Sequence, residues 1–234
     1  RLAGQAPPGV YPKYLLGQQT YFTVAGAPDS PHEGLLNEEG SLEINRGGPS
    51  LEPFLWRDGT LTTWREARLD QTLERGNLPI PTVTWQDREI RLQVTAYATG
   101  GPEQTLFARY RLENTGPRPI SLTLFVAVRP FQVNPPWQSL NMAGGFSPLR
   151  SLDWRAGNLW VNDRLAVAPL TAPARVGAAA FAQGELVDQL RRGRLAESTT
   201  ARDADGLAAA ALAYPVTLPA GGAKVLELAM PQAD

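Results

Sequence analysis

Apolar and polar residues alternate over three consecutive stretches of the chain, residues 90–98, 106–112 and 120–128. A period of two places successive side chains on opposite faces of an extended backbone, whereas a helix needs a period near 3.6. We therefore expect three long strands, each with one face in an apolar core. Their connectors, TGGPEQ and NTGPRP, contain the Gly, Asn and Pro residues of short reversals, so we expect an antiparallel meander.

The second and third stretches also carry apolar residues on their other face, at Phe107, Phe125 and Ala127. Strands at the centre of a two-sheet sandwich show this pattern because both of their faces are covered. Shorter runs of the same kind, bounded by Gly, Pro, Asn or Asp, fill much of the remaining chain. The sequence predicts an all-β fold with a minor helical part: one large antiparallel sandwich of two packed sheets over residues 1–234.

One helix is predicted, in the segment GELVDQLRRGR at residues 184–194. Leu186 and Leu190 lie four residues apart on one helical face, and three arginines crowd the C-terminal end, where the helix dipole favours positive charge. The segment at residues 64–76 fits an amphipathic helix and an outer strand equally well.

The balance of charge excludes some classes of partner. The 22 basic and 23 acidic residues are scattered along the chain, so we expect no nucleic-acid partner. No apolar run approaches the roughly 20 residues of a membrane span. With no Cys and a single His, we expect no disulfide, no metal site and no cofactor. The absence of Cys fits a reducing, cytoplasmic compartment. Because the chain begins with Arg1, we expect a piece of a longer protein.

Residues with potential for catalysis are few. His32 is the only imidazole and lies in the polar turn SPHEG, and the visible carboxylates are Glu38, Glu39, Asp58 and Asp87. Paired carboxylates hydrolyse glycosides when they lie roughly 5 to 10 Å apart. All four carboxylates stand at turn positions, where acidic residues are common for backbone reasons. Nucleophile-elbow, phosphate-loop and dinucleotide-binding patterns are absent. We therefore expect no catalytic residue in this chain.

The segment RPFQVNPPWQ, residues 129–138, is the strongest candidate for a contact surface. Its side chains of interest are Arg129, Gln132, Asn134, Trp137 and Gln138. Most of the six Trp should fill the core. A stiffened, exposed Trp137 would instead stack on a sugar ring while the polar side chains bond its hydroxyls. The same groups would suit a neighbouring domain, and the neighbouring domain is the reading that we favour, with a rigid loop projecting from the third long strand.

With this segment and the stretches GNLPIPTVTW and GLAAAALAY, the chain resembles the large β-sandwich that precedes an (α/α)6 barrel in several carbohydrate-active proteins. It is most similar to the N-terminal domain of bacterial proteins related to glycogen debranching enzymes, and more loosely to that of maltose and cellobiose phosphorylases. The resemblance runs from YFTVAGAP to VLELAMP. It implies a super-sandwich of the galactose mutarotase type, with the catalytic acids mainly in the helical barrel. Mutarotases use more than one His, and this chain has only His32.

The resemblance implies a non-catalytic accessory domain of a glycoside hydrolase-like enzyme. Its partner would be the helical catalytic domain of the same parent chain, and an oligosaccharide is the second partner that the segment would suit. Two alternatives remain open. One is a stand-alone carbohydrate-binding module, and the other is a small sugar-acting hydrolase or epimerase that uses carboxylates such as Glu38 or Asp58.

Overall fold

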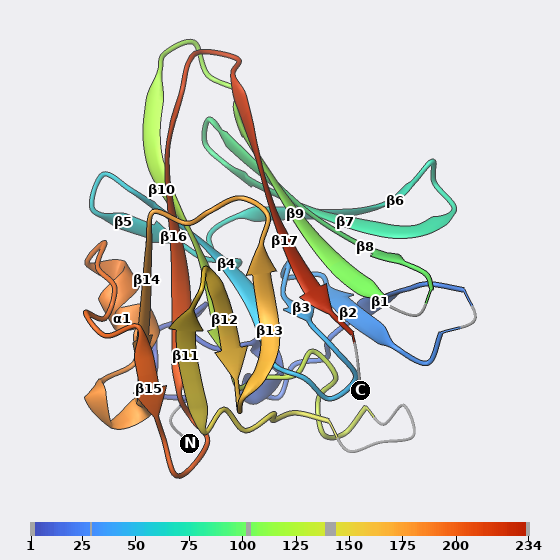
Figure 1. The fold of residues 1–234 in the computed structure, drawn as a ribbon. Coiled ribbons are helices and arrows are strands. Elements are labelled where there is room, and N and C mark those ends of the chain that lie inside the picture. Colours follow the sequence, from blue (N-terminus) through green and yellow to red (C-terminus); the bar gives the residue numbers. More distant parts are fainter. Residues whose placement is uncertain (1–2, 29, 102–103, 139–143, 233–234) are drawn as a thin grey trace.

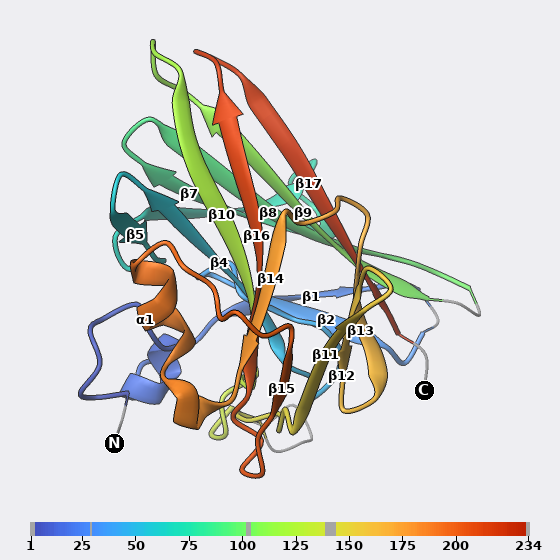
Figure 2. The same ribbon diagram turned by 60° about the vertical axis from the view of Figure 1, so that its left-hand side comes forward.

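The computed structural model describes residues 3–28, 30–101, 104–138 and 144–232. Two antiparallel sheets pack face to face, as Figure 1 and Figure 2 show from two directions. This arrangement confirms the predicted all-β sandwich. No helix in the described part of the chain is long and apolar enough to span a bilayer.

The first sheet has the order β1-β2-β3-β4-β10-β16-β14, with β5 paired to β4. Its strands are β1 (Phe22–Gly26), β2 (Glu33–Asn37), β3 (Leu42–Glu43), β4 (Ser50–Arg57), β5 (Thr60–Thr62), β10 (Ile120–Arg129), β14 (Arg175–Ala179) and β16 (Ala209–Leu218). The second sheet has the order β15-β11-β12-β13-β17-β9-β8-β7-β6. Its strands are β6 (Arg68–Glu74), β7 (Leu78–Asp87), β8 (Ile90–Thr99), β9 (Thr105–Asn114), β11 (Ser151–Arg155), β12 (Asn158–Val161), β13 (Arg164–Pro169), β15 (Thr200–Arg202) and β17 (Ala223–Pro231).

The main core fills the space between the two sheets. Alternate side chains of β8, β9 and β10 point into it, including Leu92, Leu112 and Leu124, and all three are fully buried. The period of two in the sequence therefore reflects the packing of alternate side chains between the two sheets. The segment at residues 64–76 contains an edge strand, β6, rather than a helix, and most of that strand is exposed.

The predicted meander is wrong in its third strand. β8 and β9 pair along their whole length, from Ile90 with Asn114 to Thr99 with Thr105. The next strand, β10, belongs to the other sheet, where it lies between β4 and β16, and β17 takes the place beside β9. A short connector that contains Gly and Pro serves a hairpin and a crossing between packed sheets equally well, so the turn signal could not distinguish them.

The side chain of Asn114 holds this crossing in place. It is fully buried and donates hydrogen bonds to the backbone oxygens of Arg118 (2.7 Å) and Pro219 (2.9 Å). Pro219 belongs to the second crossing, between β16 and β17, which runs beside the first one at the top of Figure 1. One amide therefore joins the two places where the chain passes from sheet to sheet.

A second apolar cluster lies on the outer face of the first sheet. Phe125 and Ala127 of β10 contribute to it, and they are covered by α1 (Leu186–Arg191) and by the N-terminal segment around Val10. In Figure 2, α1 lies at the side of the sheet, where it contacts β4, β5 and β16. The predicted helix is thus confirmed in its central part, and it explains why β10 is apolar on both faces.

We predict that Asn114→Ala lowers the free energy of unfolding by about 2–3 kcal/mol, because several buried backbone oxygens lose their donor. Asn158→Ala is the matched control, since the Asn158 amide bonds only the nearby Ala156 oxygen at an exposed turn. The control should change stability by less than about 0.5 kcal/mol. Urea unfolding followed by circular dichroism measures both, and equal effects would contradict the role given to Asn114.

Candidate functional site

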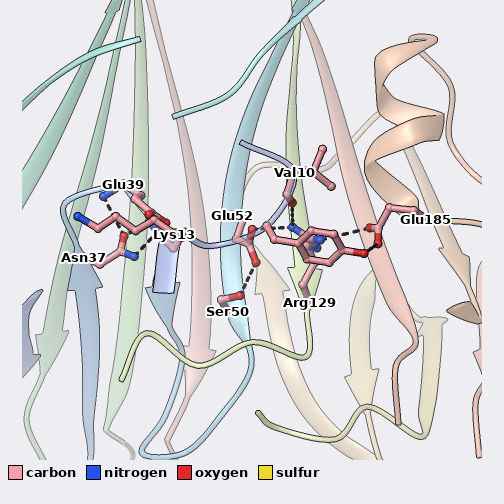
Figure 3. A network of polar contacts seen from close by, with 10 residues as sticks. Val10, Lys13, Asn37, Glu39, Ser50, Glu52, Arg129 and Glu185 are labelled. Carbon is pink, nitrogen blue, oxygen red and sulfur yellow. Dashed lines mark hydrogen bonds and ion pairs between the residues drawn. The ribbon is translucent and has the colours of Figure 1, made fainter. Parts of the chain in front are cut away.

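The end of β10 places Arg129 at the centre of a buried network of ion pairs. Figure 3 shows its guanidinium between two carboxylates from distant parts of the chain. Nη1 donates to Glu52 of β4 (3.0 Å) and to the backbone oxygen of Val10 (2.6 Å), and Nη2 donates to Glu185 (3.2 Å). The Arg129 side chain is only 1% exposed. The network therefore joins the first sheet, the N-terminal segment and the start of α1.

Two aromatic rings complete the surroundings of this guanidinium. It lies over Phe131 at 4.6 Å and over Tyr11 at 5.2 Å from the ring centroids, and cation–π attraction adds to the ion pairs. Burial lowers the pKa of Arg129, but the charges of Glu52 and Glu185 more than offset this and the pKa is raised. Arg129 therefore remains charged, and its partners are structurally required.

An apolar pocket of about 400 Å³ opens beside this network. Its walls come from the N-terminal segment, from the end of β10 and the two residues after it, and from Leu207 and the start of β16. The remaining wall runs from the end of β14 through η2 (Phe181–Gln183) to the start of α1. The side chains that line it are mostly apolar, and they include Leu15, Phe131, Phe181, Leu186 and Leu207. Arg129, Glu185 and Tyr11 provide its polar groups.

The candidate residues of the segment at 129–138 lie in two different environments. Arg129, Gln132 and Asn134 are buried. The Gln132 amide donates to the Gly47 oxygen (2.9 Å), and Gln138 exchanges two hydrogen bonds with the Thr20 backbone. Arg129, Gln132 and Asn134 do not project as expected, because they are buried, and the polar groups of Arg129, Gln132 and Gln138 are bonded within the chain. Contact with a ligand or a neighbouring domain remains a prediction, and Trp137, which is 54% exposed, is the member best placed for it.

Two functional carboxylates were not identified from the sequence. Glu43 accepts backbone N–H bonds from Gly47 (2.8 Å), Val133 (2.8 Å) and Asn134 (3.3 Å), and so holds two loops together. Burial raises its pKa, although these three bonds lower it. Glu52 is the ion-pair partner of Arg129. Each stands inside an apolar strand run, SLEIN or SLEPFLW, and a carboxylate in such a position was the available signal.

The carboxylates expected at turns are all used by the chain itself. Glu38 pairs with Lys13 and accepts the Tyr21 N–H (2.8 Å). Asp58 is exposed and pairs with its neighbour in sequence, and Asp87 accepts the hydroxyl of Thr62 (2.7 Å). The backbone oxygen of His32 accepts a bond from the Gln104 amide (2.8 Å). The side chains of Glu38, Asp58 and Asp87 are thus all bonded within the chain.

Glu39 is the most unusual of these groups. It is 1% exposed, and its carboxylate accepts the N–H of Lys13 (3.0 Å) and the Asn37 amide (3.4 Å), as Figure 3 shows. Burial raises its pKa from 4.5 to about 8, the Lys13 N–H lowers it, and the charges of Glu38 and Glu52 raise it further. A substrate has no access to this carboxyl in the described conformation, so the shift reflects burial and not catalysis.

Exposed apolar side chains gather around η1 (Lys13–Leu16). Tyr14, the buried member of η1, contacts Trp137 edge-on at 6.0 Å and donates its hydroxyl to the Gly145 oxygen (2.5 Å), next to Phe146. The Lys13 ammonium lies 5.9 Å from the centre of the Tyr21 ring. We use the name η1 patch for the exposed members of this group: Leu15, Leu16, Tyr21, Trp137 and Phe146.

The sequence matches no protein family model and no curated protein. Among solved structures, the chain is similar to a polysaccharide lyase with a TM-score of 0.44 and 15% identity, over 92% of this chain and 33% of the lyase. It is also similar to a human-microbiome protein described provisionally as a kojibiose phosphorylase. There the TM-score is 0.42 and the identity 8%, over 91% of this chain and 25% of that one. The chain thus spans a third or less of these two carbohydrate-active enzymes.

We predict that Arg129→Met destabilises the fold by about 3–5 kcal/mol, because Glu52 is left as a buried charge without its cation. The double variant Arg129→Met, Glu52→Met should recover part of this loss, since it removes both charges. Urea unfolding of the two variants and the wild type gives the comparison. A double variant no more stable than the single one would contradict the assignment.

The raised pKa of Glu39 predicts a pH-dependent stability. Between pH 4.5 and about 8 the folded protein keeps a proton that the unfolded chain releases, so the free energy of unfolding should fall as pH rises through this window. Each pKa unit corresponds to about 1.4 kcal/mol. Glu39→Gln should remove most of the fall, whereas Glu74→Gln, on an exposed strand, should not. Parallel stability curves for Glu39→Gln and wild type would contradict this.

Proposed function

We propose that this chain is a non-catalytic accessory domain of a carbohydrate-active, glycoside hydrolase-like enzyme, and that it packs on the helical catalytic domain of the same parent chain through the η1 patch. The observation that carries the proposal is the gathering of exposed aromatic and aliphatic side chains around η1. The other large exposed apolar residues of the described chain are spread over separate strands and loops: Val24, Leu73, Leu78, Leu170 and Val225.

An apolar patch of this kind is typical of an interaction surface. Soluble proteins seldom expose several large apolar side chains together unless a partner covers them. The aromatic members of the η1 patch, Trp137, Tyr21 and Phe146, are of the type enriched at the centres of protein interfaces.

Hydrogen bonds also hold the backbone beside the patch in place. Glu43 fixes the backbone of Val133 and Asn134, and Gln138 is bonded on both sides to the backbone of Thr20. A surface that is already ordered loses little conformational entropy when it binds. This favours a permanent contact surface over a mobile loop.

A non-catalytic role is supported by the placement of the acidic groups. The carboxylates that could have formed a hydrolytic pair are Glu38, Glu39, Asp58 and Asp87, and each is either engaged by its own chain or buried. The reaction would therefore belong to the helical partner, as the resemblance to debranching-like proteins implies.

A carbohydrate-binding module is the second candidate, and the exposed Trp137 ring favours it. The side chain is 54% exposed, so part of the ring is open to stacking by a sugar. Gln138, the polar neighbour of Trp137, already has its amide bonded to Thr20, so this candidate has fewer groups available for sugar hydroxyls.

We predict that Leu16→Glu weakens the binding of this domain to the catalytic domain encoded beside it by at least about tenfold, because a charge would be buried in the interface. Leu73→Glu is the matched control: both leucines are 38% exposed, but Leu73 lies on the distant edge strand β6. The two domains are produced separately and titrated in a calorimeter.

Equal losses for the two variants, or a gene that encodes no helical domain beside these residues, would contradict the docking proposal. Titration of the domain alone with maltose-type and cellobiose-type oligosaccharides separates the two candidates. Heat that disappears in Trp137→Ala would favour the binding module instead.

A further inference from the structure

The pocket beside Arg129 has the size and lining of a ligand site. Its volume of about 400 Å³ lies in the range of small-molecule pockets, which are mostly apolar with a few convergent polar groups. Phe131 follows β10, Phe181 belongs to η2, and Leu15 is 40% exposed. Glu185 bonds both Arg129 and Tyr11, so these three residues form the polar end of the pocket.

The charges at that end do not balance. Arg129 is one cation, whereas Glu52 and Glu185 are two carboxylates bonded to it. Two further carboxylates lie close by. Asp188 of α1 acts electrostatically on Tyr11, and Asp203 accepts the N–H of Phe181 (2.8 Å) in the pocket wall. The network of Arg129, Glu52 and Glu185 therefore carries one net negative charge.

Glu185 is the carboxylate that a ligand can reach. Its side chain is 16% exposed and lines the pocket, whereas Glu52 lies deeper. One of its oxygens accepts Arg129 (3.2 Å), and the other accepts the Tyr11 hydroxyl (2.6 Å). Each carboxylate oxygen has a second lone pair, so both can accept another hydrogen bond from inside the pocket.

We propose that this pocket binds an organic cation, with an apolar body the size of an aromatic ring among Leu15, Phe131 and Phe181 and an ammonium or guanidinium end on Glu185. The cation neutralises the excess negative charge, which a neutral ligand leaves unchanged and an anion increases. A free amine and a Lys or Arg side chain of another polypeptide share this chemistry. The site shares Leu15 with the η1 patch but none of the other patch residues, so it does not depend on the proposed function.

The first test compares three probes with nearly the same apolar body: phenethylamine, 2-phenylethanol and phenylacetate. Calorimetric titration of the whole domain at neutral pH should give millimolar binding for the amine. The alcohol should bind at least about tenfold more weakly, and the carboxylate should not bind. Equal affinities, a preference for phenylacetate, or no binding of any probe would overturn the proposal.

Two variants test the position of the charge. Glu185→Gln keeps the shape of the side chain and should reduce phenethylamine binding to the level of the alcohol. Leu15→Lys places a cation at the pocket rim, where a substitution does not disturb the core, and should also weaken the amine by about tenfold. An amine affinity unchanged in Leu15→Lys would overturn the site even if Glu185→Gln does not fold.

Trp137→Ala separates this inference from the docking proposal. Trp137 belongs to the η1 patch and does not line the pocket, so amine binding should be unchanged in this variant. A loss of amine binding there would place the probe on the patch and overturn the pocket assignment.

A second pair of probes distinguishes the two sources of the cation. N-acetyl-lysine methylamide presents a butylamine chain that is attached to a peptide backbone. Butylamine is the same chain without the backbone. Comparable binding of both means that the pocket admits a side chain from a polypeptide, whereas binding of butylamine alone assigns the site to a small amine. Either result supports the cation site, and binding of phenethylamine alone assigns it to a small amine with a ring-sized apolar body.

Discussion

The covering of the outer face of the first sheet depends on the buried guanidinium of Arg129. An arginine stays protonated when it is buried, so its charge and its N–H groups must be matched by hydrogen-bond acceptors. Here the acceptors are Val10, Glu52 and Glu185, which come from the N-terminal segment, the neighbouring strand and the start of α1. Placing these acceptors around one side chain brings the N-terminal segment and α1 onto the sheet, where they close the second apolar cluster.

The pocket follows from the same arrangement. The N-terminal segment and the segment of η2 and α1 both contact Arg129, and both line the pocket, with Leu15 from one and Phe181 from the other. Phe131, after β10, completes the lining. The site is thus a by-product of packing a polar network against an apolar sheet face. The negative charge at the pocket comes from the network, because two carboxylates surround one guanidinium.

Glu43, on β3, has a corresponding role for the loop that follows β10. Its carboxylate ties the backbone after β10 to the loop around Gly47 through three N–H bonds. The aromatic residues of the η1 patch are therefore presented on a fixed backbone. This ordered apolar patch is the surface on which the proposed accessory role depends.

The sequence by itself determined the three long strands, the central part of the one helix and the presence of a two-sided core around β10. These properties follow from local periodicity, because a pleated strand exposes alternate residues to different surroundings. The role of most tryptophans as core residues was also predictable: Trp85 is buried, and Trp56, Trp64 and Trp154 pack against the two clusters.

Only the tertiary structure decided which sheet received β10 and which polar residues were buried. Alternation reports which face of a strand is covered but not which strand covers it, so a hairpin and a crossing between sheets leave the same pattern. The partners of Arg129 lie 77 and 56 residues away in the sequence, at Glu52 and Glu185. An Arg that bonds water and one that bonds a distant carboxylate look alike in the chain, because the difference lies in long-range contacts that no local pattern records.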